Sequence, residues 1–410
     1  MMKKKFLMLS IAITAIGLSS CRQGCTDPLA LNYDHTVKKD NGTCEYPPEI
    51  ITEALIDDIA APTTLVAKNY EVCGNIYVSS ELTVMPGAIF TMCEGSSITI
   101  ESNGYMNATG TAENPIIFKG ETAAKGFWTG IAFKSNNPNN KLIHASVSDA
   151  GTYWAWDYAG VYVGNNAQIS MSNSSITNNA EYGLFIENGG LISNFSSNTF
   201  GTNKIGFSLA VDQVHKIDGA SNYNEANTND YVEVRNGTIG TDVTWPATTT
   251  PLLVDDLTID GGLTLSPGSN IKMEATAVIN VKATGYLNAT GTSSNPITIV
   301  GRYASTGYWS GMRIESNNPN NKLIYTTIAD GGNYWAYEYS NIHVKGKVEM
   351  NNCNVNNANS YGLYIDNGAQ ISCNSTIATT ITAVEAANSF SGNGTGPDAN
   401  CTAACTVFFE

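Results

Sequence analysis

The chain repeats itself, and this tandem duplication limits its possible folds more than any other feature. Residues 126–158, GFWTGIAFKSNNPNNKLIHASVSDAGTYWAWDY, align without gaps to residues 307–339, GYWSGMRIESNNPNNKLIYTTIADGGNYWAYEY, at an offset of 181 (307 minus 126). Upstream, GYMNATGTAENPI pairs with GYLNATGTSSNPI at the same offset, and downstream YGLFIENGG pairs with YGLYIDNGA at an offset of 179. We therefore expect two homologous repeats, residues 48–235 and 236–410.

Each repeat contains a finer period of short strand-like runs, which recur every 21 to 23 positions except across one interval of 30. The runs are bounded by Asn, Gly and Ser and have no helical period between them, which is typical of a β-solenoid. A coil of this length favours an all-β, right-handed parallel β-helix, since a coil buries its inward face only by stacking on its neighbours. We expect the residues that lead these runs to occupy equivalent places on successive coils. They are Gly130, Gly160, Gly183 and Gly206 in the first repeat, and Gly311, Asn341 and Gly362 in the second.

The cysteine spacing supports stacked coils independently. Cys73 and Cys93 are 20 positions apart, and so are Cys353 and Cys373. Residues one coil apart in a stacked sheet lie about 4.8 Å from each other, which is within the roughly 4.4–6.8 Å that a disulfide needs between its Cα atoms. We predict that each pair links neighbouring coils near one end of the solenoid. The other cysteines expected in disulfides are Cys25, Cys44, Cys401 and Cys405.

The N-terminus has the pattern of an export signal. A basic stretch, MMKKKF, precedes a short apolar stretch, LMLSIAITAIG, that is too short to span a membrane. The following LSSC resembles the lipobox of bacterial lipoproteins, which implies removal of residues 1–20 and lipidation of Cys21. The protein is then expected in the cell envelope, anchored by its lipid, at the outer membrane. The alternative is an ordinary cleaved signal that leaves a free cysteine.

Residues 21–47 combine this anchor with a small module. GCTDPLALNYDHTVKKDNGTCEYP resembles a short module of many Bacteroidota surface proteins, although Asn41 and Thr43 depart from its D-G-S-C pattern. A loop this short cannot bury a core, so a Cys25–Cys44 bridge is expected to hold it together. Its oxygen-bearing side chains suit a structural calcium ion, and the alternative is ordinary turn chemistry. The candidate calcium ligands are Asp27, Asn32, Asp34 and Asp40.

The body of the chain, from residue 50 to about 390, resembles the right-handed β-helix family that includes pectin-lyase-like proteins. It looks closer still to uncharacterised Bacteroidota lipoproteins with segments such as LTVMPGA and GFWTGI. Enzymes of this fold imply an alternative function, polysaccharide lyase or glycoside hydrolase, which requires clustered carboxylates. The two repeats share no histidine or arginine, and we predict no catalytic residue. The charged residues that they do share are Asp149 and Asp330, Asp157 and Glu338, Glu187 and Asp366, and Lys141 and Lys322.

An aromatic segment occurs in the one long interval of each repeat, GTYWAWDYAG at 151–160 and GNYWAYEYSN at 332–341. Insertions in solenoids form loops on one face, often the binding face. Aromatic rings beside carboxylates suit sugar binding, and the alternative is that the rings fold back and cover the solenoid. If extended, each segment alternates its side chains between two sides. The candidate ligand-binding residues are Tyr153, Trp154, Trp156, Asp157 and Tyr158, with Tyr334, Trp335, Tyr337, Glu338 and Tyr339.

These features favour a non-catalytic envelope lipoprotein that acts as a binding or adhesion scaffold. Its expected partners are the membrane, through the lipid, and a polysaccharide or another envelope protein. A net charge of −15 argues against nucleic acid, which attracts basic surfaces. The two aromatic segments are expected to act as paired glycan subsites, about eight coils or about 40 Å apart in a continuous solenoid.

Overall fold

The computed structural model describes residues 22–28, 30–45 and 52–394, and the backbone of 399–401. It divides into two compact units, one within the first 51 residues and one from Thr52 onward. The export signal, Cys21 and Cys405 lie outside the described residues, and Cys401 is described by its backbone alone.

The first unit is a small loop module. Its strands β1 (Gln23–Gly24) and β2 (Lys39–Asp40) pair in parallel. The predicted Cys25–Cys44 disulfide is confirmed, with Cα atoms 4.8 Å apart across a sequence separation of 19. This bridge ties the two ends of a segment that is too short for a core of its own.

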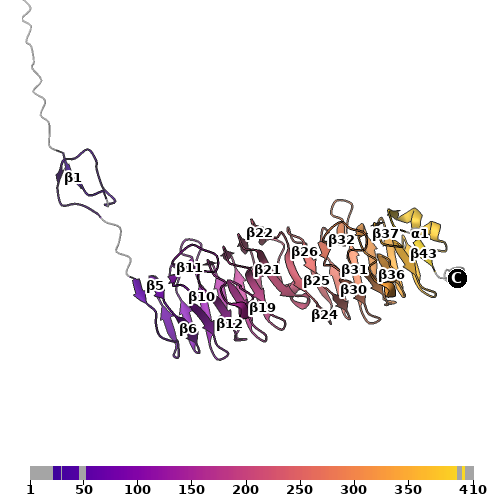
Figure 1. The fold of residues 1–410 in the computed structure, drawn as a ribbon, viewed down its shortest axis with the longest axis horizontal. Coiled ribbons are helices and arrows are strands. Elements are labelled where there is room, and N and C mark those ends of the chain that lie inside the picture. Colours follow the sequence, from indigo (N-terminus) through magenta and orange to yellow (C-terminus); the bar gives the residue numbers. More distant parts are fainter. Residues whose placement is uncertain (1–21, 29, 46–51, 395–398, 402–410) are drawn as a thin grey trace, which may run out of the picture. The chain divides into compact units, whose positions relative to one another are not determined.

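The second unit is a parallel β-helix, which confirms the predicted fold class. Its coils stack in one row, as the ribbon from β5 to β43 shows (Figure 1). Most coils contribute one strand to each of three faces, which we name A, B and C in the order in which the chain visits them.

Face A is one 13-stranded parallel sheet that runs through both repeats of the described chain. Its strands are β6 (Asn75–Val78), β9 (Ser97–Ile100), β12 (Gly130–Phe133), β15 (Val161–Val163), β18 (Tyr182–Ile186), β21 (Ile205–Ala210), β23 (Val232–Arg235), β26 (Leu252–Val254), β29 (Asn270–Met273), β32 (Ile297–Gly301), β35 (Thr326–Ala329), β38 (Asn354–Asn356) and β42 (Ser389–Ser391).

Face B consists of two sheets, which the 3-10 helix η2 (Val211–Lys216) separates. The first contains β4 (Thr63–Leu65), β7 (Glu81–Val84), β10 (Tyr105–Thr109), β13 (Lys141–Ile143), β16 (Gln168–Ser172) and β19 (Leu191–Ser196). The second contains β24 (Gly237–Ile239), β27 (Leu257–Ile259), β30 (Val278–Val281), β33 (Gly311–Ile314), β36 (Ile342–Val344), β39 (Leu363–Ile365) and β43 (Ala399–Cys401).

Face C is likewise made of two sheets. The first contains β3 (Thr52–Ala54), β5 (Asn69–Val72), β8 (Ile89–Met92), β11 (Ile116–Gly120), β14 (Ala145–Ser148), β17 (Ser175–Thr177), β20 (Thr199–Gly201) and β22 (Asn222–Glu225). The second contains β25 (Val243–Trp245), β28 (Gly262–Leu265), β31 (Tyr286–Thr290), β34 (Lys322–Ile324), β37 (Lys347–Asn351), β40 (Gln370–Cys373) and β41 (Thr376–Ile377). The helix α1 (Ile381–Ala387) follows β41, and the Thr380 side chain caps it by accepting from the Ala383 N–H at 3.1 Å.

The second repeat is turned by one face relative to the first. Gly130 and Gly311 are equivalent in the duplication, yet β12 lies on face A and β33 on face B. The first aromatic segment lies where the chain passes from face C to face A, between β14 and β15. The second lies where it passes from face A to face B, between β35 and β36. The two segments therefore emerge at opposite edges of face A, about 34 Å apart along it for the seven strand steps from β15 to β35.

The core is a column of inward side chains that stack from coil to coil. In most strands every second residue is buried, as in the iBeB pattern of β5. On face C, Tyr70, Phe90 and Phe118 stack with ring centroids 5.2 and 4.6 Å apart. Such stacking adds to the free energy gained by burying the rings, so the column holds adjacent coils in register.

The glycines that lead the face A strands occupy equivalent places, as predicted. The residues that follow them pair in register from coil to coil, Ile131 with Val161, then Leu184, then Phe207. A Cβ at Gly160 would lie 2.5 Å from the side chain of Asn179. Asn179 donates from Nδ2 to Asn203 Oδ1 at 2.9 Å, so a ladder of buried amides takes the space that the glycines leave. The predicted glycines are Gly130, Gly160, Gly183 and Gly206, and an amide side chain lies in this space at the last three.

The predicted Cys73–Cys93 disulfide is confirmed. Val72 of β5 pairs with Met92 of β8, so the local coil spans 20 positions and the next residues, Cys73 and Cys93, lie opposite each other with Cα atoms 4.8 Å apart. The bridge links two coils at the N-terminal end of the solenoid.

The predicted Cys353–Cys373 disulfide is wrong, since both thiols are free. Lys347 of β37 pairs with Gln370 of β40, so the coil here spans 23 positions (370 minus 347) and a spacing of 20 no longer brings two positions together. Cys353 instead lies in the turn before β38, where its Sγ donates to the Leu323 carbonyl at 2.9 Å. Cys373 ends β40 on face C.

Candidate functional site

Both aromatic segments fold as single 3-10 turns rather than as extended chain. The first turn, η1, is Trp154–Trp156, and the second, η3, is Trp335–Tyr337. Each turn is closed by two non-glycine residues in the left-handed region, with φ of 52° at Asp157 and 53° at Tyr158 in the first. The alternation expected of an extended segment is therefore absent from both. We call residues 151–160 the first loop and residues 332–341 the second loop.

Each loop buries one aromatic ring and exposes three. In the first loop Trp154 is 70% exposed and Trp156 is 8% exposed. In the second loop Trp335 is 68% exposed and Tyr337 is 3% exposed. The sugar-binding and packing interpretations thus apply to different side chains of the same loop. The remaining candidate residues, Tyr153, Asp157, Tyr158, Tyr334, Glu338 and Tyr339, are exposed.

The buried ring of the first loop packs on the outer side of face A. Trp156 stacks on Tyr162 of β15 with centroids 6.2 Å apart and planes 12° apart. Tyr162 stacks on Phe185 of β18 at 6.2 Å, and the guanidinium carbon of Arg235 lies 4.3 Å from the Phe185 centroid. This row of stacked groups fixes the height of the loop above the sheet.

A groove of about 770 Å³ lies between the first loop and the outer side of face A. Its floor comes from β6 and β9, one wall from the first loop, and the other from the turn after β15. Aromatic rings, hydroxyls and amides dominate the lining, which consists of Asn75, Tyr77, Gly95, Ser97, Thr99, Thr129, Lys134, Tyr153, Ala155, Trp156, Tyr162, Gly164, Asn165 and Glu187.

The two charged groups of this groove are engaged within the protein. Lys134 Nζ lies 3.5 Å from Glu101 Oε1. Glu187 Oε2 accepts from the Tyr162 hydroxyl at 2.5 Å and from the Asn165 N–H at 2.9 Å. Burial, and then the hydrogen bond to Glu187, raises the pKa of the Tyr162 hydroxyl, so it stays a neutral donor.

The second loop covers a different floor on face B. Arg313 of β33 lies beneath it, with its guanidinium carbon 4.5 Å from the Tyr337 centroid. Arg313 Nη1 lies 3.3 Å from Glu315 Oε1, and Nη2 donates to the Ala336 carbonyl within the loop. The cavity beside this loop is smaller, about 430 Å³, and Arg313 is not part of its lining.

The buried aspartates shared by both repeats have structural partners. Asp149 Oδ2 accepts from the Gly120 N–H at 3.2 Å and from Ser148 Oγ at 2.8 Å. Asp330 Oδ1 accepts from Asn357 Nδ2 at 2.6 Å, and burial raises the pKa of this carboxyl. Both residues adopt left-handed conformations, with φ of 70° and 69°. Their carboxylates therefore hold corners of the coil.

The other shared charged residues lie at strand ends and edges. Asp366 contacts His343 Nε2 at 3.0 Å and Lys345 Nζ at 3.4 Å. Lys322 Nζ lies 3.8 Å from Glu349 Oε2, while Lys141 is half-buried at the start of β13.

In the small module, the candidate calcium ligands take part in turns. Asn32 Oδ1 accepts from the Glu45 N–H at 2.9 Å, and Asp34 Oδ1 accepts from the Thr36 N–H at 2.9 Å. Asp40 Oδ1 accepts from the Gly42 N–H at 2.8 Å. The bonds of Asp34 and Asp40 are turn bonds, which the composition of the module also predicts, whereas the Asn32 bond joins residues 13 positions apart. With Asp27, these residues stay a prediction as calcium ligands.

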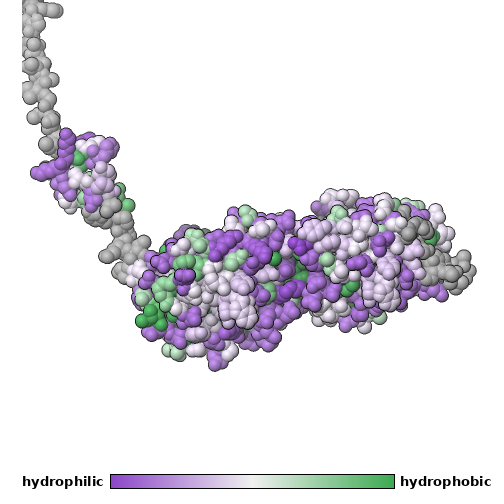
Figure 2. Space-filling model, in the orientation of Figure 1, coloured by the Kyte–Doolittle hydropathy of each residue, from purple (hydrophilic) through white to green (hydrophobic). Residues whose placement is uncertain are grey.

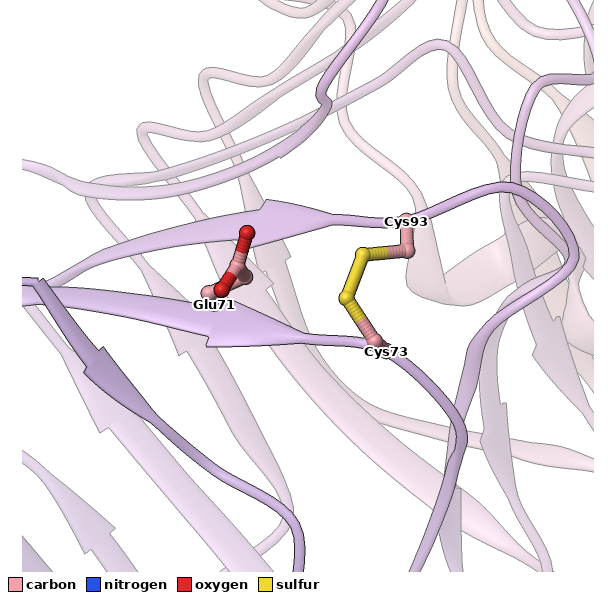
Figure 3. Close-up of side chains that lie close together, drawn as sticks. All are labelled: Glu71, Cys73 and Cys93. Carbon is pink, nitrogen blue, oxygen red and sulfur yellow. A yellow bond between two sulfur atoms is a disulfide. The ribbon is translucent and has the colours of Figure 1, made fainter.

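Within the described residues, one cluster brings three metal-type ligand atoms within 4.8 Å of one another, namely Glu71, Cys73 and Cys93. Figure 3 shows the two sulfur atoms bonded to each other, with the Glu71 carboxylate beside them. Because thiolates rather than disulfides bind metal ions, this cluster is a covalent link between coils.

Most of the visible surface of the solenoid is polar. Figure 2 shows hydrophilic residues over most of the visible face of the solenoid, with apolar residues gathered near its N-terminal end. Ile56, Val66, Tyr77 and Met85 are among the exposed apolar residues of these first coils. Within the described residues, every helix is too short or too polar to cross a membrane. Comparisons with protein-family models, curated proteins and solved structures found no match for this chain.

The sequence pointed to the loop residues of the groove and missed its floor. Tyr77, Thr99, Ala132 and Tyr162 follow one another in register across β6, β9, β12 and β15. In β12 this position is two places after the leading glycine, so an alignment of the coils by their glycines could have found part of the row. The lengths of the intervening coils vary, which hides the rest.

Proposed function

We propose that this protein is a non-catalytic, lipid-anchored scaffold of the cell envelope that binds glycans in the groove beside the first loop. The observation that carries the proposal is the groove itself, where exposed aromatic rings stand over a floor of hydroxyls and amides. Sugar rings stack on aromatic faces through their C–H groups, while their hydroxyls need polar partners at the rim. Tyr153 of the lining offers the first kind of contact, together with Trp154 beside it at a centroid distance of 6.0 Å. Asn75, Ser97 and Asn165 offer the second kind.

The test is binding of the mature chain to an array of envelope and plant-type glycans. This chain begins at position 21, where Ser replaces Cys21. We expect retention of at least one polysaccharide, and loss of that signal when Trp154 is replaced by Ala. Because Trp154 is 70% exposed, its replacement leaves the core unchanged. Equal binding by parent and variant contradicts the proposed site, and the absence of any bound glycan contradicts the proposed function.

The anchor is a separate part of the proposal and needs its own test. Lipidation of Cys21 predicts that the protein fractionates with membranes and that its N-terminal peptide carries acyl groups by mass spectrometry. The Cys21→Ala variant is expected in the soluble fraction with a retained or differently cleaved signal. Membrane fractionation that does not depend on Cys21 contradicts the anchor.

Glycoside hydrolysis remains the second candidate, and one observation favours it. Partial desolvation of the otherwise exposed Asp157 raises its pKa, Arg235 lowers it, and the charge of Glu187, which lines the groove, raises it further. Glycosidases use a carboxylic acid and a nearby carboxylate as their catalytic pair. Release of reducing ends from a bound polysaccharide, abolished by Asp157→Asn, would establish this activity in place of simple binding.

A further inference from the structure

The two loops stand on rows of side chains that are equivalent in the duplication but chemically different. On face A the row beneath the first loop contains small residues between two tyrosines, and on face B the row beneath the second loop is polar and charged. In register, the two rows are Tyr77, Thr99, Ala132 and Tyr162, and Thr258, Asn280, Arg313 and His343.

The decisive difference lies at the third position of each row. Ala132 is fully buried and presents only a methyl group between Thr99 and Tyr162, two residues that line the first groove, whereas Arg313 extends under the second loop. The Arg313 side chain is 19% exposed, stacks on Tyr337 and donates to the carbonyl of Ala336, so it fills the space and ties the loop down. The cavity beside the second loop is also smaller, about 430 Å³ against about 770 Å³ beside the first.

Several polar atoms of the second floor are also buried within the described chain. Asn280 Oδ1, Arg313 Nε and His343 Nδ1 are all buried without a hydrogen-bond partner within the described chain. All three belong to consecutive positions of one row, and His343 is 3% exposed. His343 lies beneath the second loop, with its ring centroid 6.4 Å from that of Tyr337, so the loop closes this end of the row.

The charge of the first groove restricts the kind of ligand. Lys134 is paired with Glu101, and Glu187 is engaged with Tyr162 and Asn165, so neither presents an unpaired charge to a ligand. The remaining polar groups are neutral hydroxyls and amides. The protein as a whole carries a net charge of −15, which repels polyanions at low salt. An uncharged sugar chain fits this groove better than a uronate chain does.

We infer that the first repeat alone binds glycans and that its ligand is an uncharged segment of polysaccharide. The difference between Ala132 in the first repeat and Arg313 in the second decides which repeat binds. The inference rests on the proposed glycan-binding function and names its ligand class and its specificity-determining position. The groove lining reaches from β6 to Glu187, the residue after β18, which is four strand steps or about 19 Å, so the groove accommodates a short run of sugars.

The experiment is calorimetric titration of the mature chain with three soluble polymers, a neutral β-glucan, a neutral mannan and polygalacturonate. The parent is expected to bind one neutral polymer and to bind polygalacturonate at least tenfold more weakly. Ala132→Arg, which copies the second repeat, should weaken binding of the neutral polymer at least tenfold, whereas Ala132→Ser should stay within twofold. Arg313→Ala should leave binding within twofold of the parent.

A second variant guards against misfolding of Ala132→Arg. Tyr77→Thr copies the second repeat at an exposed floor position, and we expect it to weaken binding threefold to tenfold with an unchanged melting temperature. Hydrogen exchange gives a readout for the second loop that is independent of ligand, since Arg313→Ala should speed amide exchange in residues 333–340. Unchanged exchange there means that Arg313 does not pin the loop and overturns that step.

The outcomes separate the inference from the function on which it rests. If the parent binds none of the three polymers, the glycan-binding proposal fails. If the parent binds a neutral polymer and both Ala132→Arg and Tyr77→Thr bind it equally well, glycan binding stands and the assignment to the first groove falls. Preference for polygalacturonate overturns the uncharged class, and a loss of binding in Arg313→Ala shows that the second repeat takes part.

Discussion

The first and second loops have nearly the same sequence and the same backbone, yet they cover different floors. In each loop one ring is buried and three are exposed, and the same left-handed pair closes the turn. The floors differ because they come from strands whose outward residues have diverged, Ala132 in one repeat and Arg313 in the other. The shape of a loop is thus set within its own short segment, while the chemistry beneath it is set by residues one coil away.

A second comparison shows how the scaffold is kept while side chains change. In the first repeat Asn179 Oδ1 accepts from the Ala150 N–H at 2.9 Å, across the space left by Gly160. In the second repeat the residue equivalent to Gly160 is Asn341, and its Oδ1 accepts from the Gly331 N–H at 2.7 Å. Gly331 is the equivalent of Ala150, so one buried backbone amide is satisfied from two different positions.

The residue equivalent to Asn179 completes this exchange. It is Ala358, 179 positions later, whose small side chain leaves room for Asn341. The pair Gly160 and Asn179 of the first repeat corresponds to Asn341 and Ala358 in the second. The hydrogen bond to the buried backbone N–H is kept. Either change alone would leave a clash or an unpaired amide, so the two positions are coupled.

This coupling gives the largest expected effect. Gly160→Asn places a Cβ 2.5 Å from the Asn179 side chain and should lower the free energy of unfolding by about 3 kcal/mol. Asn179→Ala leaves the Ala150 N–H unpaired and should cost about 2–3 kcal/mol. The double variant copies the second repeat and should return to within about 1 kcal/mol of the parent. Chemical denaturation of all four proteins measures the cycle, and simple additivity of the two losses contradicts it.

The cysteine pairs extend the comparison to the two ends of the solenoid. Replacing both Cys73 and Cys93 by Ser removes a bridge across a sequence separation of 20 and should cost about 3 kcal/mol. The same replacement of Cys353 and Cys373 removes no bridge and should cost about 1 kcal/mol, mainly at the buried Cys353. Thermal unfolding without reductant compares the two. Equal losses, or a Cys353–Cys373 peptide in a non-reducing digest, contradict this assignment.

The exposed tryptophans provide a matched pair for binding. Trp154 and Trp335 are 70% and 68% exposed, so replacement of either by Ala should change stability by less than about 0.5 kcal/mol. If the first groove is the binding site, Trp154→Ala should weaken binding of a neutral polymer about tenfold, and Trp335→Ala by less than twofold. Calorimetric titration of both variants decides between one site and two, because two working sites predict similar losses.

The position of the loops also bears on the expectation of paired subsites. The seven strand steps between them are close to the eight coils that the duplication predicts. The loops lie at opposite edges of face A, however, and their buried rings pack on different faces. A single straight polymer therefore cannot follow both loops without winding around the solenoid, and avidity would require separate chains.

Much of the fold follows from the sequence because a solenoid is a local structure. The runs led by Gly130, Gly160 and Gly183 mark successive coils directly, and the Cys73–Cys93 bridge follows from a spacing that equals the local coil. The Cys353–Cys373 bridge was predicted from the same spacing, but the coil there is longer, since Lys347 pairs with Gln370. A pattern of residues gives the mean coil length, while a disulfide depends on one particular coil.

The candidate site was only partly predictable for a related reason. The aromatic loops are continuous in sequence, so their residues could be named, but which ring is buried depends on the 3-10 turn. The floor unites Tyr77 and Tyr162, which are 85 positions apart in sequence (162 minus 77) and meet only through the registers of four strands. The rotation of the second repeat by one face relative to the first also depends on the irregular coil that contains η2.

The smallest expected effect concerns the reactivity of the two free thiols. Burial raises the pKa of the Cys353 thiol to about 12, and burial also raises the pKa of the half-buried Cys373 thiol. A raised pKa means that less thiolate, the reactive form, is present at a given pH, so both thiols should react more slowly than a free cysteine at pH 8. Cys373 should be alkylated first, because it is partly accessible while Cys353 is buried beside the Leu323 carbonyl.

Mass spectrometry of folded protein after timed alkylation at pH 8 and pH 9.5 measures the alkylation rates of both thiols. Both rates should be higher at pH 9.5 than at pH 8. In denaturant the two cysteines should react equally fast, which serves as the control. Faster labelling of Cys353 than of Cys373 in the folded protein would show that the turn before β38 opens. The second repeat would then be held less firmly at its C-terminal end than the first coils, which the Cys73–Cys93 bridge ties together.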